Sequence, residues 1–66
     1  MENIVEHYRS IPIYKDGYSY YIECKDKNDV KHRIYSYYRS ALKAKITRSL
    51  LHDNLKLNGE YVYIYF

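Results

Sequence analysis

The chain has 66 residues, a formal net charge of +3, one cysteine and no tryptophan. This length predicts one domain, residues 1–66, with a small core and little stability to spare. A single cysteine excludes an intramolecular disulfide framework. Because the sequence has neither a signal peptide nor a long apolar run, we expect a cytoplasmic protein with no membrane partner.

The first turn signal is Asp16-Gly17, which lies between two alternating apolar runs. Glycine reaches the positive φ of a tight turn at low cost, so the pair predicts a hairpin. Its strands are expected at residues 11–14 and 18–25. Because Pro12 has no amide hydrogen to donate, the first of them should lie at a sheet edge. The residues before this hairpin, 1–10, fit a short helix and a strand equally well.

A polar turn at residues 26–29 precedes a third alternating run, which predicts a strand over residues 30–35. The apolar period then changes from two to about four, which predicts a helix over residues 36–53. Ser36 is its expected N-cap, because a serine hydroxyl can accept a hydrogen bond from a first-turn amide. Four side chains form the main apolar stripe: Tyr38, Leu42, Ile46 and Leu50.

A weaker second stripe on the helix indicates that it contacts more than one surface; it contains Tyr37, Ala41, Ala44 and Leu51. After the helix, Asn58-Gly59 is a strong two-residue hairpin signal, and the chain ends in a strand with the sequence EYVYIYF. Together these elements predict an α+β fold. It has a small antiparallel sheet of three to four strands with one helix packed on one face, in the order β-β-β-α-β.

Strand alternation divides the predicted sheet into two faces. The face under the helix should form the core: Tyr20, Ile22, Cys24, Val30, His32, Ile34, Val62, Ile64 and Phe66. The opposite face, here called the outer face, carries tyrosines among basic residues, with Glu23 between them. We predict that it is the partner-binding face, through Tyr21, Lys25, Lys31, Arg33, Tyr35, Tyr61, Tyr63 and Tyr65.

Several interpretations of the outer face are open. Tyrosine has a high strand propensity, so each ring can be there only for cross-strand pairing. A cluster of exposed rings, however, is typical of an interaction site. Tyrosine and arginine are enriched in protein-binding hot spots, which favours a protein partner. Direct DNA or RNA binding is the second interpretation, with rings stacking on bases and cations meeting phosphates.

The nucleic-acid interpretation has a pattern in its favour. The strand-turn-strand-turn-strand-helix order of YKDGYSYYIECKDKNDVKHRIYSYYRSALKAK resembles the arm-type DNA-binding domains of phage integrases. The resemblance covers about half of the chain, includes no diagnostic motif and leaves out the terminal strand. It implies docking of a three-stranded sheet on DNA. Against this, phosphate binding by six to ten contacts needs more cations than the three on the outer face. A homodimer in which two outer faces pack together is a further alternative.

Catalytic and metal signatures are weak. His7, His32, His52 and Cys24 lack the close paired spacings of zinc sites, so we expect no metal or cofactor. A metal-independent ribonuclease could use His32 or His52 as a general base, with Arg33, Arg39 or Lys43 stabilising charge. We instead expect His32 to be a half-buried structural residue and Cys24 a buried apolar one. We therefore predict no catalytic residue.

Residue usage indicates an AT-rich genome, because residues with A/T-rich codons, such as Tyr, Ile, Lys and Asn, outnumber Gly, Ala, Arg and Pro. Small proteins of this kind are typical of phages and mobile elements. We thus expect a non-enzymatic inhibitor, of the anti-CRISPR sort, that occludes a host protein or protein–nucleic-acid complex. A helix arc of Arg39, Lys43 and Thr47 is an alternative contact surface.

Overall fold

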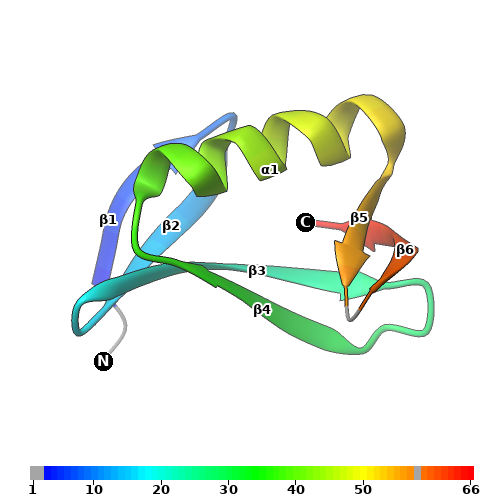
Figure 1. Ribbon diagram of the computed structural model, residues 1–66, viewed down its shortest axis with the longest axis horizontal. Helices are drawn as coiled ribbons and strands as arrows, with labels where there is room; N and C mark the ends of the chain where they lie inside the picture. Colours follow the sequence, from blue (N-terminus) through cyan, green and yellow to red (C-terminus); the bar gives the residue numbers. More distant parts are fainter. Residues whose placement is uncertain (1–2, 58) are drawn as a thin grey trace.

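The computed structural model describes residues 3–57 and 59–66. Its elements are β1 (Asn3–Tyr8), β2 (Ile11–Asp16), β3 (Ser19–Asp26), β4 (Lys31–Ser36), α1 (Arg39–His52), β5 (Asn54–Leu57) and β6 (Glu60–Tyr65). Figure 1 shows α1 lying across a long β3–β4 ribbon, with the β1–β2 and β5–β6 hairpins at its opposite ends. The α+β class, the antiparallel pairing and the single helix are confirmed. The predicted strand number and the order β-β-β-α-β are wrong, since the sheet has six strands.

Two strands, β1 and β5, are absent from the predicted order: residues 1–10 fit a helix and a strand equally well, and the strand before the Asn58-Gly59 hairpin signal is not counted. In β1 the pairing register with β2 shifts between Ile4 and Glu6, so Ile4 and Val5 break the simple alternation of apolar and polar residues. Strand β5 has only four residues and follows α1 directly. Of the predicted Asn58-Gly59 turn, Asn58 lies outside the described residues, and Gly59 has the expected positive φ of 85°.

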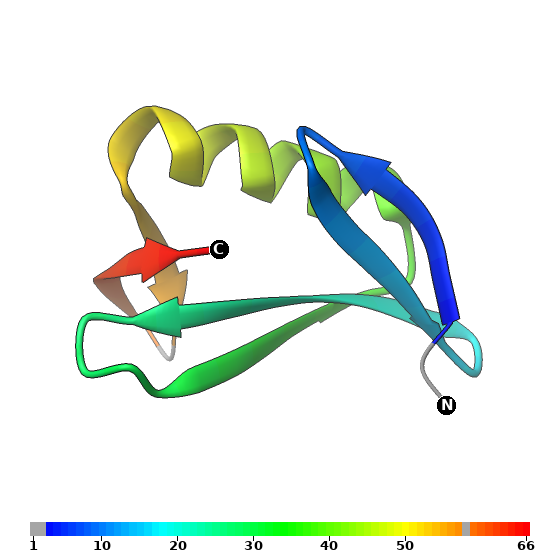
Figure 2. The same cartoon turned by 180° about the vertical axis from the view of Figure 1, so that it is seen from behind.

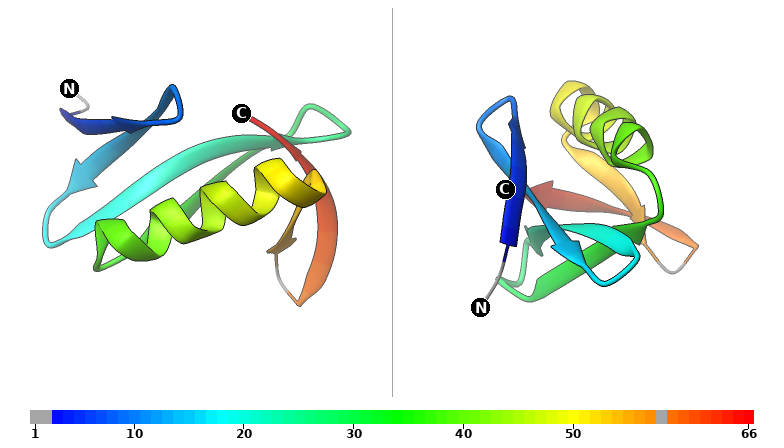
Figure 3. Two further views of the ribbon diagram at one scale, coloured as in Figure 1. Left: turned by 90° about the horizontal axis from the view of Figure 1, so that it is seen from above. Right: turned by 90° about the vertical axis from the view of Figure 1, so that its left-hand side faces the viewer.

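Strand β3 is the centre of the sheet, whose order is β1-β2-β3-β6-β5 with β4 on the other edge of β3. Strand β2 pairs with β3 at Ser19–Tyr21, and β6 pairs with it at Lys25 and Asp26. Seen from behind, β2 and β6 therefore approach β3 from the same side and diverge from each other (Figure 2). Seen from above, the β1–β2 hairpin lies to one side of α1, and the β5–β6 hairpin lies at the C-terminal end of the helix (Figure 3).

The predicted edge position of the Pro12 strand is wrong for β2 as a whole, because β2 lies between β1 and β3. Only Tyr14, Lys15 and Asp16 of β2 pair with β3, however, and Pro12 pairs with His7 of β1 alone. Among the residues that the structure describes, Pro12 thus has a strand on one side only. This explains how a residue without an amide hydrogen fits a strand that has two neighbours.

The core lies between α1 and the inner face of the sheet. Of the predicted core, Ile22, Cys24, Ile34 and Ile64 are buried. Tyr20 and Val62 pack against this cluster as half-buried residues. Val30 and Phe66 are exposed, contrary to prediction, because both lie just outside their strands.

The prediction of which helix residues face the core is partly wrong. Leu42 and Ile46 are fully buried, but Leu50 is exposed and Ser49 is buried in its place. At about 100° per residue, Leu50 lies about 80° around the helix from Leu42, whereas Ser49 lies only about 20° away. The buried Ser49 hydroxyl donates a hydrogen bond to the Ile46 carbonyl at 3.1 Å, which satisfies it.

The predicted helix start is also wrong. Strand β4 continues through Ser36, the N-cap position is the exposed Tyr38, and Tyr38 makes no side-chain cap hydrogen bond. The Ser36 hydroxyl accepts a hydrogen bond from the Tyr38 amide at 3.3 Å. Ser36 therefore stabilises the link between β4 and α1 and lies two residues before the observed N-cap position.

Candidate functional site

The outer face is built by strand register, because residues opposite each other on neighbouring strands project to the same side. In the β3–β4 ladder Tyr21 lies opposite Tyr35, and Lys25 lies opposite Lys31. Strand β6 adds Tyr65, which pairs with Lys25 from the other edge of β3. The structure thus brings the β3 and β4 members of the predicted face together with Tyr65.

Tyr21 is the exception among the predicted contact residues, because it is only 4% exposed. Its ring stacks on that of Tyr14 at 4.9 Å and 17° and meets that of Tyr35 at 5.2 Å. The Arg33 guanidinium lies 4.7 Å from the Tyr21 ring centroid. Tyr21 is therefore the buried centre of a second, smaller cluster on the outer face and is unable to contact a partner.

Tyr14 was missed in the sequence, although a signal for it exists. A two-residue turn at Gly17 and Tyr18 places Asp16 opposite Ser19 and therefore Tyr14 opposite Tyr21. Counting back from the turn would have placed a tyrosine of β2 on the outer face.

The remaining tyrosines of the predicted face are accessible. Tyr35 is 48% exposed, and Tyr61, Tyr63 and Tyr65 on β6 are 68%, 58% and 59% exposed. Tyr61 lies opposite Lys56 of β5, whose Nζ is 6.0 Å from the ring centroid. Tyr61 also lines a groove between α1 and β5, so it lies at the border of the outer face.

The charges of the outer face are largely balanced within the protein. Arg33 lies opposite Glu23, and the pKa of Arg33 is raised by a hydrogen bond to Tyr35 first, then by Tyr21 and, more weakly, by Glu23. Lys25 Nζ lies 3.4 Å from Asp29 Oδ1. Among the three predicted cations, only Lys31 has no acidic partner within the described residues. The face therefore presents accessible rings with little free positive charge.

The alternative arc on the helix serves the fold. Glu6 of β1 pairs with Lys43 and, at 3.4 Å, with Arg39. The hydroxyls of Thr47 and Tyr8 lie 2.9 Å apart. All three residues of the arc thus hold β1 against α1. The positive charges of Arg39 and Lys43 are partly neutralised by Glu6.

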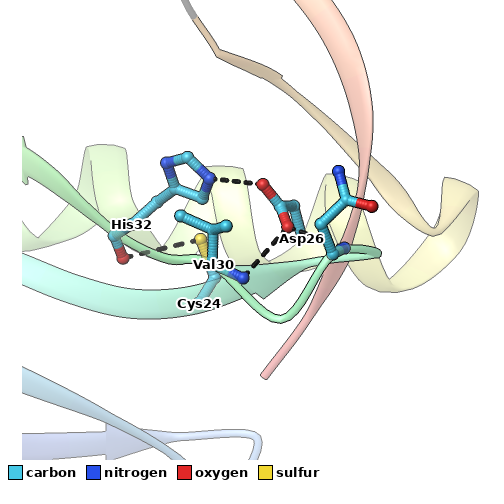
Figure 4. A network of polar contacts seen from close by, with 5 residues as sticks. Cys24, Asp26, Val30 and His32 are labelled. Atoms are coloured by element: carbon cyan, nitrogen blue, oxygen red, sulfur yellow. Dashed lines mark hydrogen bonds and ion pairs between the residues drawn. The ribbon is translucent and has the colours of Figure 1, made fainter.

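Cys24, Asp26 and His32 lie together at the end of the β3–β4 ribbon, as Figure 4 shows. His32 Nε2 is 2.8 Å from Asp26 Oδ2, while the Cys24 thiol donates to the His32 backbone carbonyl at 3.8 Å. Burial first, and then the Asp26 charge, raises the pKa of Cys24 to about 11. A raised pKa opposes formation of the nucleophilic thiolate. His32 is half-buried, as predicted.

Asp26 also organises the turn that joins β3 to β4. Its Oδ1 accepts hydrogen bonds from the amides of Asn28 at 2.8 Å and Val30 at 3.1 Å. The hydrogen bond from His32 lowers the pKa of Asp26 most, and those two amides lower it further. In this network the polar groups of Asp26 and His32 stabilise the turn.

Among the described residues, no three His, Cys, Asp or Glu side chains lie close enough together to hold a metal ion. No helix in that part of the chain has the length and apolar character needed to span a bilayer. Comparisons of the chain with known protein families, characterised proteins and solved structures found no significant match.

Proposed function

We propose that this chain is a small non-enzymatic binding protein that docks on a partner protein through its outer face. The observation that carries the proposal is the set of accessible tyrosines on the outer face: Tyr35, whose ring meets that of the buried Tyr21, and Tyr63 and Tyr65 on β6. Such rings offer a large contact area, and a tyrosine side chain has only two χ angles to immobilise on binding.

Charge favours a protein over nucleic acid as the partner of this face. Phosphate binding depends on several convergent free cations. On the outer face Arg33 is offset by Glu23 and Lys25 by Asp29, which leaves Lys31. Accessible tyrosines flanked by one or two cations match the composition of protein-binding hot spots.

The finer form of the proposal is inhibition by occlusion of a host protein or protein–nucleic-acid complex in the cytoplasm. Its support is the small size and the AT-rich residue usage, which are typical of phage and mobile-element products. Inhibitors of bacterial defence, including anti-CRISPR proteins, are the functional class with these features.

The test compares wild type with Tyr63→Ala in pull-downs from a lysate of the source cell. Leu51→Ala is the matched control, since Leu51 is an apolar residue on α1 that is 74% exposed. We expect a specific protein to be retained by wild type and Leu51→Ala and lost with Tyr63→Ala. Neither substitution should change the free energy of unfolding by more than about 0.5 kcal/mol.

Two outcomes would contradict the proposal. One is capture of the same proteins by all three forms, which would make the outer face inert. The other is a concentration-dependent dimer in sedimentation that Tyr63→Ala dissociates, which would make the face a homodimer interface.

A further inference from the structure

A groove of about 850 Å³ runs between α1 and the edge strand β5, on the flank of the helix away from β1. Ala41 and Ala44 are among the residues that line it, and their small side chains occupy little of the space. Lys45 and Arg48 line it from the helix, and Lys56 and Tyr61 line it from the β5–β6 hairpin. Figure 1 shows the end of the molecule where α1 and β5 lie next to each other.

The groove is basic, and none of the described residues that line it is acidic. Lys45 and Arg48 are three residues apart, so they share one flank of the helix. Within residues 3–57 and 59–66, no ion pair involves Lys45, Arg48 or Lys56. Arg39 and Lys43, on the flank that meets β1, are instead paired with Glu6. The groove therefore concentrates free positive charge, unlike the outer face.

Tyr61 adds an aromatic surface to this charge. Tyr61 is 68% exposed and lies opposite Lys56, whose Nζ is 6.0 Å from the centroid of the tyrosine ring. Sites that bind single strands combine a positively charged groove with aromatic rings on which bases stack. Duplex bases are already stacked on each other, so an exposed ring favours a single strand.

We propose that the groove between α1 and β5 binds a short single strand of nucleic acid. Lys45, Arg48 and Lys56 contact phosphates, and Tyr61 stacks on a base. This site shares Tyr61 with the border of the outer face, but its cations Lys45, Arg48 and Lys56 lie outside that face, so substitutions can test strand binding and protein docking separately. RNA and DNA single strands share the required chemistry, and the test distinguishes them.

The test is fluorescence anisotropy of labelled ten-nucleotide oligo(dT), oligo(U) and a duplex of the same length, from about 50 to 200 mM salt. Three phosphate contacts predict a log–log salt slope of about −2 for a single strand, so affinity should fall roughly 20-fold over this range. Tyr61→Ala should weaken binding roughly five- to 150-fold, as removal of one base–aromatic stack does.

A pair of double variants isolates the groove from net charge. Lys45→Gln with Arg48→Gln removes two of the three contacts and should flatten the slope to about −0.7. Lys25→Gln with Lys31→Gln removes the same charge from the outer face and should leave the slope near −2. Circular dichroism confirms that each variant is folded.

The proposal is overturned if no single strand binds at the lowest salt, if the duplex binds more tightly than both single strands, or if the two double variants weaken binding equally. It is also overturned if a poly-glutamate peptide of equal charge binds as tightly, because the site would then select charge alone. Loss of strand binding in Tyr61→Ala, with partner capture still sensitive only to Tyr63→Ala, would establish the two surfaces as independent.

Discussion

The Tyr21 ring stacks on the Tyr14 ring, with centroids 4.9 Å apart and planes 17° apart, on the side of the sheet away from α1. Tyr21 is thereby buried on the same face that exposes Tyr35, Tyr63 and Tyr65. One strand residue thus supports the face, while Tyr35, Tyr63 and Tyr65 are left to meet a partner.

Tyr21→Ala is expected to destabilise the protein by about 3 kcal/mol, because it removes a buried aromatic ring and leaves a cavity. Tyr63→Ala removes an exposed ring and should change stability by less than about 0.5 kcal/mol. Urea unfolding followed by circular dichroism measures both. Equal effects of the two substitutions would mean that Tyr21 is not the centre of a packed cluster.

Ser10→Gly is expected to stabilise the protein by about 0.5–1 kcal/mol. Arg9 and Ser10 form the β1–β2 turn with φ values of 51° and 69°, a left-handed conformation that costs a residue with a Cβ about 1–2 kcal/mol. The greater freedom of glycine in the unfolded chain offsets part of the gain.

Gly17→Ala, in the β2–β3 turn, is the matched control for Ser10→Gly in the β1–β2 turn. Gly17 has a φ of 62°, and no heavy atom would lie within 4 Å of an added Cβ. The substitution should therefore cost about 1 kcal/mol through backbone conformation alone. A lower midpoint in thermal unfolding for Ser10→Gly would show that the β1–β2 turn is not under this strain.

Asp26→Asn is expected to lower the melting temperature at neutral pH by an amount that shrinks in acid. The pKa of Asp26 is lowered in the folded state, first by the His32 hydrogen bond and then by the Val30 and Asn28 amides. Its contribution to stability is therefore complete above the unfolded pKa of about 3.9 and is lost as the pH falls through the lower folded value.

Thermal melts of wild type and Asp26→Asn from about pH 7 to about pH 2 measure this difference. Asp29→Asn changes the same charge in the same turn at an exposed side chain and should have little effect at any pH. A difference between wild type and Asp26→Asn that stays constant down to the lowest pH would contradict the linkage.

Cys24 is expected to react about 100-fold more slowly with iodoacetamide near pH 8 than an unperturbed cysteine does. Burial raises its pKa from a usual value of about 9 to about 11, which reduces the thiolate fraction by that factor. The thiol is also only 3% exposed, so the rate should rise to the unperturbed value in urea. Mass spectrometry of the alkylated protein measures the rate. Fast labelling of the native protein would place Cys24 outside the core.

The sequence by itself determined the features that depend on local geometry. Asp16-Gly17 marked the β2–β3 hairpin, and a side-chain period of two put Lys25, Lys31, Arg33 and Tyr35 on one face. Leu42 and Ile46 were correctly placed in the core because 3.6 residues per turn brings them to one side of the helix. Each of these features involves residues that are close in the chain.

Only the tertiary structure decided which tyrosine is buried and where free positive charge gathers. Tyr21 is covered because Tyr14 from β2 and Tyr35 and Arg33 from β4 converge on it. The basic groove exists because β5, which the predicted order of elements left out, brings Lys56 to the same groove as Arg48 of α1. Glu6 neutralises one flank of α1 because β1 docks there and leaves the other flank charged. Contacts between distant segments carry no periodic signal, so the sequence alone did not reveal them.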